Sequence, residues 1–139
     1  MDNRSRRGTL RGLHDQLRHQ QAKLCRVIRG EVLDVAVDIR RGSPTFGQWT
    51  SATLSAENMR QIYIPRGFAH CFVVLSEVAE FLYKGSGFYD PASENGVHWS
   101  DPQLAIDWGI ANPIVSAKDS RYPHPAELST DLLPVYEHL

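Results

Sequence analysis

The chain has 139 residues, a length that suits one domain around a single hydrophobic core. Hydrophobic residues make up 42% and charged residues 22% of the sequence, a composition that excludes intrinsically disordered, collagen-like and coiled-coil proteins. Fifteen Lys and Arg against sixteen Asp and Glu give a formal net charge of -1, so we expect neither nucleic acid nor a membrane as a partner.

The cysteines and the N-terminus indicate the compartment. Cys25 and Cys71 show neither CxxC nor zinc-ligand spacing, and two cysteines are too few to hold a domain of this size together by disulfides. No apolar run approaches the roughly 18 residues of a membrane-spanning helix, and no apolar stretch of the signal-peptide type follows the charged N-terminus. We therefore expect a soluble protein of the cytoplasm.

The first predicted elements are a basic arm and two strands. Residues 1–11 carry four arginines, and we expect an arm that is either solvated or part of a ligand site. In residues 33–39 the large apolar side chains fall on alternate positions, which is the period of a half-buried strand. Residues 23–28 form the preceding strand. Because Gly30 in the connection suits a tight hairpin, we predict that these two strands pair antiparallel.

Four further strands are expected between turn residues, over residues 48–54, 61–64, 70–75 and 80–84. Residues 55–58 suit a single helical turn. Residues 113–139 form a less regular tail, in which the apolar residues of 132–136 would pack a last helix or strand against the body. Short strands with almost no helical periodicity predict an all-β fold, a jelly-roll barrel, in a single domain over residues 1–139.

The segment from Pro65 to His70 carries the most informative local pattern. Pro65 and Gly67 precede a strand that begins at His70, which directs this imidazole toward the inside of the barrel. The spacing PxGxxH is similar to the second conserved motif of cupins, where the histidine is a metal ligand beside an HxH pair. No HxH pair is present, and His14 or His19 would complete a metal site only at unusual spacing, so we expect no metal. A metal-dependent cupin and a hydrogen-bonded core histidine remain as alternatives.

A colinear set of short segments extends from about Asp2 to about Asp119, and it includes residues 2–5, 11–14, 23–24, 30–32, 34–40, 43–47, 54–58, 67–70, 80–84 and 118–119. In these segments the sequence resembles the dTDP-4-dehydrorhamnose 3,5-epimerase family, cupin-fold enzymes of deoxysugar nucleotide pathways. The resemblance implies a cupin-type jelly roll with little helix and an isomerase that needs neither cofactor nor metal. Its substrate would be a dTDP-4-keto-6-deoxyhexose, epimerised at carbon 3, carbon 5 or both.

The resemblance implies four catalytic residues. His14 matches the family's catalytic base, and Asp119 matches the carboxylate that orients its imidazole. Lys23 matches the lysine beside the ketone oxygen, where negative charge develops in the enolate. Tyr83 matches a tyrosine on the opposite face of the sugar ring, the acid that returns a proton with inverted stereochemistry.

Four more positions match residues that contact the substrate. Arg11 and Asn3 correspond to contacts with the nucleotide diphosphate, Tyr89 to an aromatic at the substrate edge and His70 to a second histidine near the site. The family usually has a further N-terminal segment that pairs with the neighbouring subunit. The resemblance therefore implies a homodimer, with dimerisation and nucleotide affinity that depend on that segment.

The sequence departs from the family pattern at two positions near the expected site. Asp15 stands where an aromatic commonly follows the catalytic histidine, and Phe88 replaces what is often a tyrosine. These differences could mark an epimerase that acts at one carbon only or on a modified sugar. The alternative of another class is a truncated, catalytically impaired cupin that binds a sugar nucleotide without turning it over.

Overall fold

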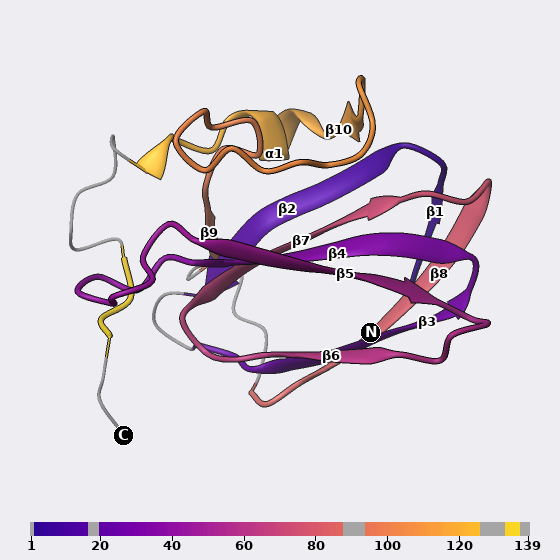
Figure 1. Ribbon diagram of the computed structural model, residues 1–139, viewed down its shortest axis with the longest axis horizontal. Coiled ribbons are helices and arrows are strands. Elements are labelled where there is room, and N and C mark those ends of the chain that lie inside the picture. Colours follow the sequence, from indigo (N-terminus) through magenta and orange to yellow (C-terminus); the bar gives the residue numbers. More distant parts are fainter. Residues whose placement is uncertain (1, 17–19, 88–93, 126–132, 137–139) are drawn as a thin grey trace.

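The computed structural model describes residues 2–16, 20–87, 94–125 and 133–136. The strands in these ranges form two facing β-sheets (Figure 1). This confirms the predicted all-β jelly-roll fold with little helix. The elements in chain order are β1 (Asp2–Arg6), β2 (Thr9–Gln16), β3 (Lys23–Arg29), β4 (Glu31–Asp38), β5 (Trp49–Ser55), β6 (Gln61–Ile64), β7 (Phe68–Val74), β8 (Val78–Gly85), β9 (Glu94–Gly96), β10 (Ile114–Val115) and α1 (Ala117–Ser120).

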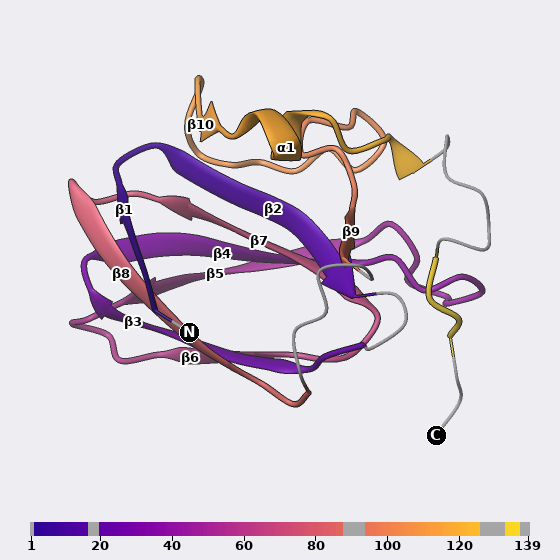
Figure 2. The same cartoon turned by 180° about the vertical axis from the view of Figure 1, so that it is seen from behind.

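The two sheets have different strand orders, which Figures 1 and 2 show from opposite sides. One sheet runs β1-β8-β3-β6, and the other runs β10-β2-β7-β4-β5 with β9 paired to β2. Neighbouring strands pair antiparallel except β10, which pairs parallel to β2. The six strands predicted between residues 23 and 85 are confirmed, with boundaries within two residues of those expected.

The predicted hairpin between β3 and β4 is wrong, because these strands belong to different sheets. Gly30, between them, has φ +82°, and a Cβ built on it would lie 2.2 Å from the carbonyl oxygen of Val78. The glycine is therefore required where the chain crosses from one sheet to the other and passes close to the start of β8. Alternation along a strand defines its buried face but not its neighbour, so the pairing was inferred incorrectly.

We expect Gly30→Ala to lower the free energy of unfolding by about 2–3 kcal/mol, because a positive φ and a backbone clash add together. Gly42→Ala is the matched control: its φ is +86°, but no atom lies within 4 Å of the added Cβ. The control isolates the conformational cost of about 1 kcal/mol. Urea denaturation of both variants measures the difference, and equal losses would contradict the close approach at Gly30.

The basic N-terminal segment, expected as an arm, instead lies within the fold. Strand β1 pairs along its whole length with β8, from Asp2 opposite Leu82 to Arg6 opposite Val78. Ser5 is buried, whereas Arg4 and Arg6 are exposed. Arginines on the outward positions of an edge strand leave its inward positions free to pack, so a charged sequence was compatible with a strand.

The C-terminal part covers β2 from outside, as the orange ribbon in Figure 1 shows. Helix α1 begins after Ser116, whose Oγ accepts a hydrogen bond from the Asp119 amide at 3.1 Å. The expected final helix or strand is reduced to an isolated bridge between Arg41 and Val135, and residues 126–132 lie outside the described chain. Residues 55–58 form the expected single turn, closed by the Met59 amide, which donates to the carbonyl oxygen of Ser55 at 3.1 Å. A further helical turn, α1, positions Asp119.

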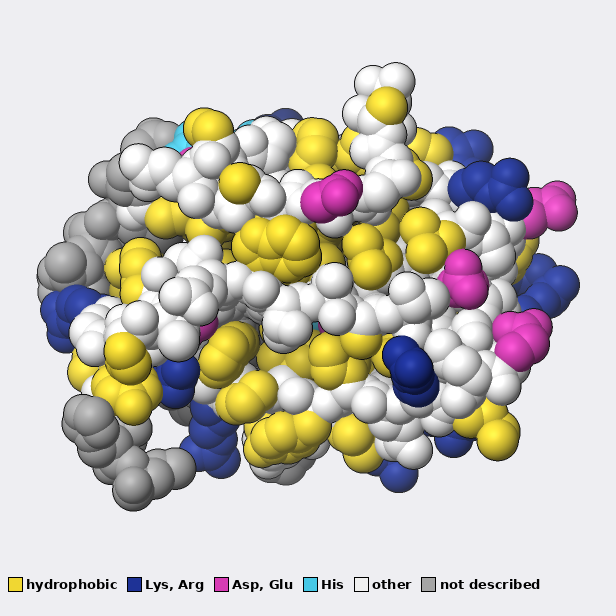
Figure 3. Space-filling model, in the orientation of Figure 1, with side chains coloured by type: hydrophobic (Ala, Val, Ile, Leu, Met, Phe, Trp, Pro, Cys, Tyr) yellow, Lys and Arg dark blue, Asp and Glu magenta, His cyan; other side chains and the backbone are white. Residues whose placement is uncertain are grey.

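Two hydrophobic clusters fill the fold. The cluster between the sheets includes Val27, Val32, Phe72 and Phe81, and the other lies between the second sheet and the C-terminal part and includes Trp108. Figure 3 shows hydrophobic side chains across the middle of one face, below the C-terminal segment. Within the described ranges, no helix has both the length and the apolarity needed to cross a membrane.

Candidate active site

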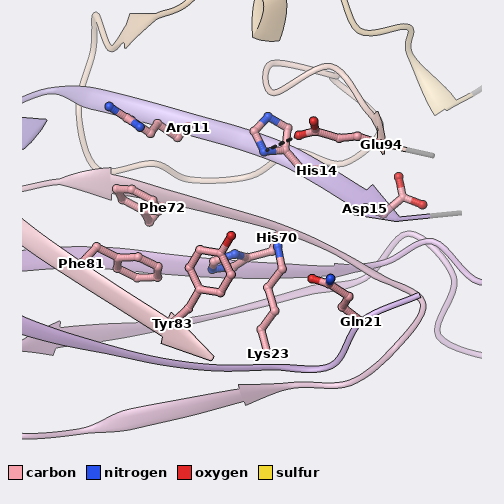
Figure 4. A pocket seen from close by; sticks show the side chains of 10 residues that line it. All are labelled: Arg11, His14, Asp15, Gln21, Lys23, His70, Phe72, Phe81, Tyr83 and Glu94. Atoms are coloured by element: carbon pink, nitrogen blue, oxygen red, sulfur yellow. Dashed lines mark ion pairs between the residues drawn. The ribbon is translucent and has the colours of Figure 1, made fainter. Parts of the chain in front are cut away.

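A cavity of about 140 Å³ opens between the two sheets. It gathers five of the eight residues expected at the site: His14 and Arg11 from β2, Lys23 from β3, His70 from β7 and Tyr83 from β8. Figure 4 shows these side chains together with the rest of the lining. The complete lining consists of Arg11, His14, Asp15, Gln21, Lys23, His70, Phe72, Phe81, Tyr83 and Glu94.

The other three expected residues have different positions. Asp119 contacts His14 from α1, outside the lining. Asn3 lies in β1 opposite Phe81. Tyr89 falls outside the described residues, as does Phe88.

An irregularity in β2 allows an odd-numbered and an even-numbered residue of the same strand to line the cavity. Arg11 and His14 are three residues apart, so in a regular strand they would face opposite sides of the sheet. The register between β2 and β7 shifts between these two residues, and both side chains line the cavity. In a regular strand only one of these two side chains would point into the cavity, whereas the irregularity between them lets both do so.

His14 and Asp119 form a close imidazole–carboxylate pair. Nε2 of His14 lies 2.6 Å from Oδ1 of Asp119, and the backbone amide of Gly12 donates to Oδ2 at 3.2 Å. Burial opposes ionisation of Asp119, but the hydrogen bonds and the charge of His14 outweigh it and lower the pKa of Asp119. The carboxylate is therefore ionised at neutral pH and accepts a proton-bearing Nε2, which leaves Nδ1 as the basic nitrogen of the ring.

Glu94 is a charged neighbour of His14 that the sequence did not indicate. Its Oε1 lies 3.6 Å from Nδ1 of His14, the ion pair drawn in Figure 4, and its Oε2 lies 2.9 Å from Nζ of Lys118. Glu94 belongs to β9, which pairs with β2 directly opposite this region. No motif surrounds Glu94, and only the β2–β9 pairing brings it to the site.

Lys23 and Tyr83 lie on the wall opposite His14. Nζ of Lys23 lies 5.2 Å from the centre of the Tyr83 ring, close enough for a favourable cation–π contact. Burial lowers the pKa of Lys23, and burial raises the pKa of Tyr83. In Figure 4 the phenol oxygen of Tyr83 points across the cavity toward β2. The two walls thus present an imidazole and a protonated phenol to the same space.

His70 has a carboxylate partner of its own. Its Nε2 lies 2.8 and 3.0 Å from the two oxygens of Asp34, which is fully buried. The ring stacks on Phe81 with centres 5.8 Å apart. His70 is therefore both a hydrogen-bonded buried histidine and part of the cavity lining, so the two interpretations considered for it are compatible.

His70 and two neighbouring side chains form a group of three potential metal ligands. The ligand atoms of Cys25, Asp34 and His70 all lie within 4.8 Å of one another. Zinc binds such donors only with the cysteine as thiolate, and burial raises the pKa of the Cys25 thiol. Because Asp34 already pairs with His70, this cluster is better suited to orienting the imidazole than to holding a cation.

Asp15 is a buried carboxyl group that costs stability. Burial is the main cause that raises its pKa from 3.8 to about 6. Between these values the native state binds more protons than the unfolded state, so stability falls as pH rises and stays lower above about pH 6. We expect Asp15→Asn to remove this loss.

The Asp15→Asn variant should be more stable than the wild type by about 3 kcal/mol at pH 7, and the gain should vanish below about pH 4. Urea denaturation across this pH range measures the effect. Asp107→Asn makes the same chemical change at an exposed position and should show no such pH dependence. A constant difference between Asp15→Asn and wild type at all pH values would contradict the assigned titration.

Comparison with known proteins identifies the family. The sequence model of the family described as dTDP-4-dehydrorhamnose 3,5-epimerase matches residues 1–127. The dTDP-4-dehydrorhamnose 3,5-epimerases of Pseudomonas aeruginosa and Shigella flexneri are 62% and 56% identical over 117 residues, which cover 84% of this chain. The chain spans 65% of the length of each of these relatives.

A crystal structure gives the same result for the fold. It shows dTDP-6-deoxy-D-glucose-3,5-epimerase from Legionella pneumophila in complex with dTDP-4-keto-L-rhamnose. The two proteins superpose with a TM-score of 0.95 at 52% identity, over 99% of this chain and 75% of the other. The match to the family model over residues 1–127, the high identity to these relatives and the shared fold show that the chain belongs to the dTDP-4-dehydrorhamnose 3,5-epimerase family.

Proposed function

We propose that the protein epimerises a dTDP-4-keto-6-deoxyhexose at the carbons next to the ketone, without cofactor or metal, in deoxysugar biosynthesis. The observation that carries this proposal is a single cavity with the His14–Asp119 pair on one side and Tyr83 on the other. The Legionella relative, whose structure holds a dTDP-4-keto sugar, supports the substrate class.

Proton removal is the first step. With Nε2 bonded to Asp119, Nδ1 of His14 takes the proton from the carbon beside the ketone, and the carboxylate stabilises the resulting imidazolium. Glu94, 3.6 Å from Nδ1, adds a second negative charge near the same ring. The electron pair of the broken C–H bond moves into the enolate, whose negative charge lies on the former ketone oxygen.

Lys23 stabilises that enolate. A fixed cation in a site shielded from water stabilises developing charge far more than the same cation in bulk water. Lys23 lies half-buried on the wall beside Tyr83, so its ammonium group needs no rearrangement when the charge forms. This role explains how a weak carbon acid reacts with an imidazole base.

Tyr83 completes the inversion. A single base that returned its own proton would restore the starting configuration, so a second proton carrier must act from the other face. Burial raises the pKa of Tyr83 above its ordinary value of 10, which keeps the phenol protonated at neutral pH and able to donate. Before the next turnover the phenolate takes a proton from solvent, and the imidazolium of His14 releases its proton to solvent.

The remaining assignments rest on the family resemblance. Arg11 lines the cavity and would meet the diphosphate, and Asn3 and Tyr89 would contact the nucleotide and the substrate edge. His70 would contact the sugar, held in place by Asp34. The homodimer and the cytoplasmic location stay predictions, and the free, buried state of both cysteines is compatible with a reducing compartment.

Deuterium incorporation from heavy water tests the function. The protein is incubated with dTDP-4-keto-6-deoxyglucose in heavy water, and NMR follows deuterium at carbons 3 and 5. Exchange at both carbons supports a 3,5-epimerase, and exchange at one supports a single-carbon epimerase. Tight binding without exchange at either carbon would overturn the proposal in favour of a binding protein, and exchange that requires added iron or manganese would favour a metal cupin.

A further inference from the structure

Asp15 lies at the end of β2, next to His14 in the chain, and its side chain lines the cavity. The residue is only 9% exposed, and among the described residues its Oδ2 has no hydrogen-bond partner. Figure 4 shows the carboxyl group on the side of the cavity where His14 and Glu94 also lie. The charged groups that face it are His14, Lys23 and Glu94.

The unpartnered Oδ2 of Asp15 is exceptional among the buried aspartates of the described chain. Five aspartates are buried in the described chain, and the other four all have side-chain partners. A buried acceptor without a partner costs free energy, whereas the paired aspartates stabilise the fold or orient a histidine. Asp34 contacts His70, Asp38 contacts Arg40, Asp101 contacts His124 and Asp119 contacts His14.

We propose that Asp15 is a specificity-determining residue that accepts a hydrogen bond from a ring hydroxyl of the hexose, at carbon 2 or carbon 3. This inference rests on the proposed function, since it takes the cavity as the sugar site. A hydroxyl is the donor that a neutral hexose offers, whereas the ketone has no proton to donate and the diphosphate would repel a carboxylate. The hydroxyl supplies the partner that the empty Oδ2 lacks.

This role also gives the departure from the family pattern a chemical meaning. An aromatic after the catalytic histidine offers an apolar surface, whereas Asp15 offers an acceptor that rejects a sugar without the matching hydroxyl. A site built to hydrogen-bond a hydroxyl discriminates strongly against the deoxy analogue, because the buried acceptor then stays unpaired. Asp15 therefore selects the hydroxylated hexose.

A double-mutant cycle between protein and substrate tests the inference. Wild type and Asp15→Leu are assayed with dTDP-4-keto-6-deoxyglucose and with its 2-deoxy and 3-deoxy analogues. The readout is kcat/KM for deuterium incorporation at carbon 5, which is next to the ketone and bears neither hydroxyl. We expect Asp15→Leu to lower kcat/KM for the parent sugar by about tenfold to a hundredfold. For one of the two analogues the same change should alter it by no more than about twofold.

Controls separate this inference from the proposed function. Glu57→Leu makes a similar change at an exposed turn and should leave all three sugars unaffected, and Asp15→Asn, which keeps an acceptor oxygen, should recover part of the loss. If Asp15→Leu lowers kcat/KM equally for the parent sugar and both analogues, Asp15 does not recognise a hydroxyl. The inference about Asp15 then fails, whereas the proposed epimerase activity is unaffected. If wild type exchanges no substrate proton at all, the proposed function itself fails.

Discussion

In the His14→Ala variant, deuterium incorporation at carbons 3 and 5 is expected to fall by about 10³- to 10⁴-fold. Among the described residues, the two carboxylates that contact His14 are held by other groups. Asp119 is 4% exposed and fixed by the Gly12 amide, so its carboxylate cannot move to the substrate. Glu94 already pairs with Lys118 at 2.9 Å. NMR of the exchange reaction in heavy water measures the loss.

The control for this prediction is His98→Ala. His98 stacks on His124 with ring centres 4.6 Å apart, and it does not line the cavity. Its removal should leave exchange unchanged. Circular dichroism of His14→Ala should match that of wild type, because His14 is partly exposed and its loss creates little empty space in the core. Retention of more than about a tenth of the wild-type exchange rate would contradict the role of His14.

The strands of the fold were predictable where the information is local. Alternating side chains and turn residues identified β3 to β8 because both signals depend only on neighbouring positions. Pairing is not local. The sequence around Gly30 has the same alternation whether the chain turns back in one sheet or crosses to the other, and only the packing against Val78 distinguishes the two.

The charged N-terminus shows a second limit of local reasoning. Arg4 and Arg6 made this segment resemble a solvated arm, yet they occupy the outward positions of β1. One buried residue between them, Ser5, is too weak a signal to reveal a strand. The partner strand β8 lies more than seventy residues away in the chain, and β1 is held in place by backbone pairing with that strand.

The same distinction between local and long-range information applies to the candidate site. The resemblance identified His14, Asp119 and Tyr83, and the first two do meet, at 2.6 Å. The residues that act on these groups were not found, because their contacts join distant parts of the chain. Glu94 reaches the site through β9, and Asp34 reaches His70 from the neighbouring strand β4. Neither has a motif around it that reports the contact.

The Tyr83→Phe variant is expected to separate proton removal from inversion. His14 remains able to take a proton, exchange it with solvent and return it to the same face, so deuterium incorporation should stay within about tenfold of wild type. Inverted product should fall by about 10²- to 10³-fold, because no phenol delivers a proton to the other face. Phenylalanine keeps the ring that contacts Lys23, so the change removes one oxygen and little else.

Comparing the two readouts distinguishes an acid from a packing residue. A Tyr83 that only supported the cavity would, when changed, lower exchange and inversion together, since both need the same bound substrate. An acid lowers inversion alone. Tyr63→Phe removes the same phenol oxygen at a position on β6 that is 65% exposed and does not line the cavity, so it should alter neither readout. Normal inversion by Tyr83→Phe would assign the second proton to another donor and leave the His14–Asp119 pair as the surviving half of the mechanism.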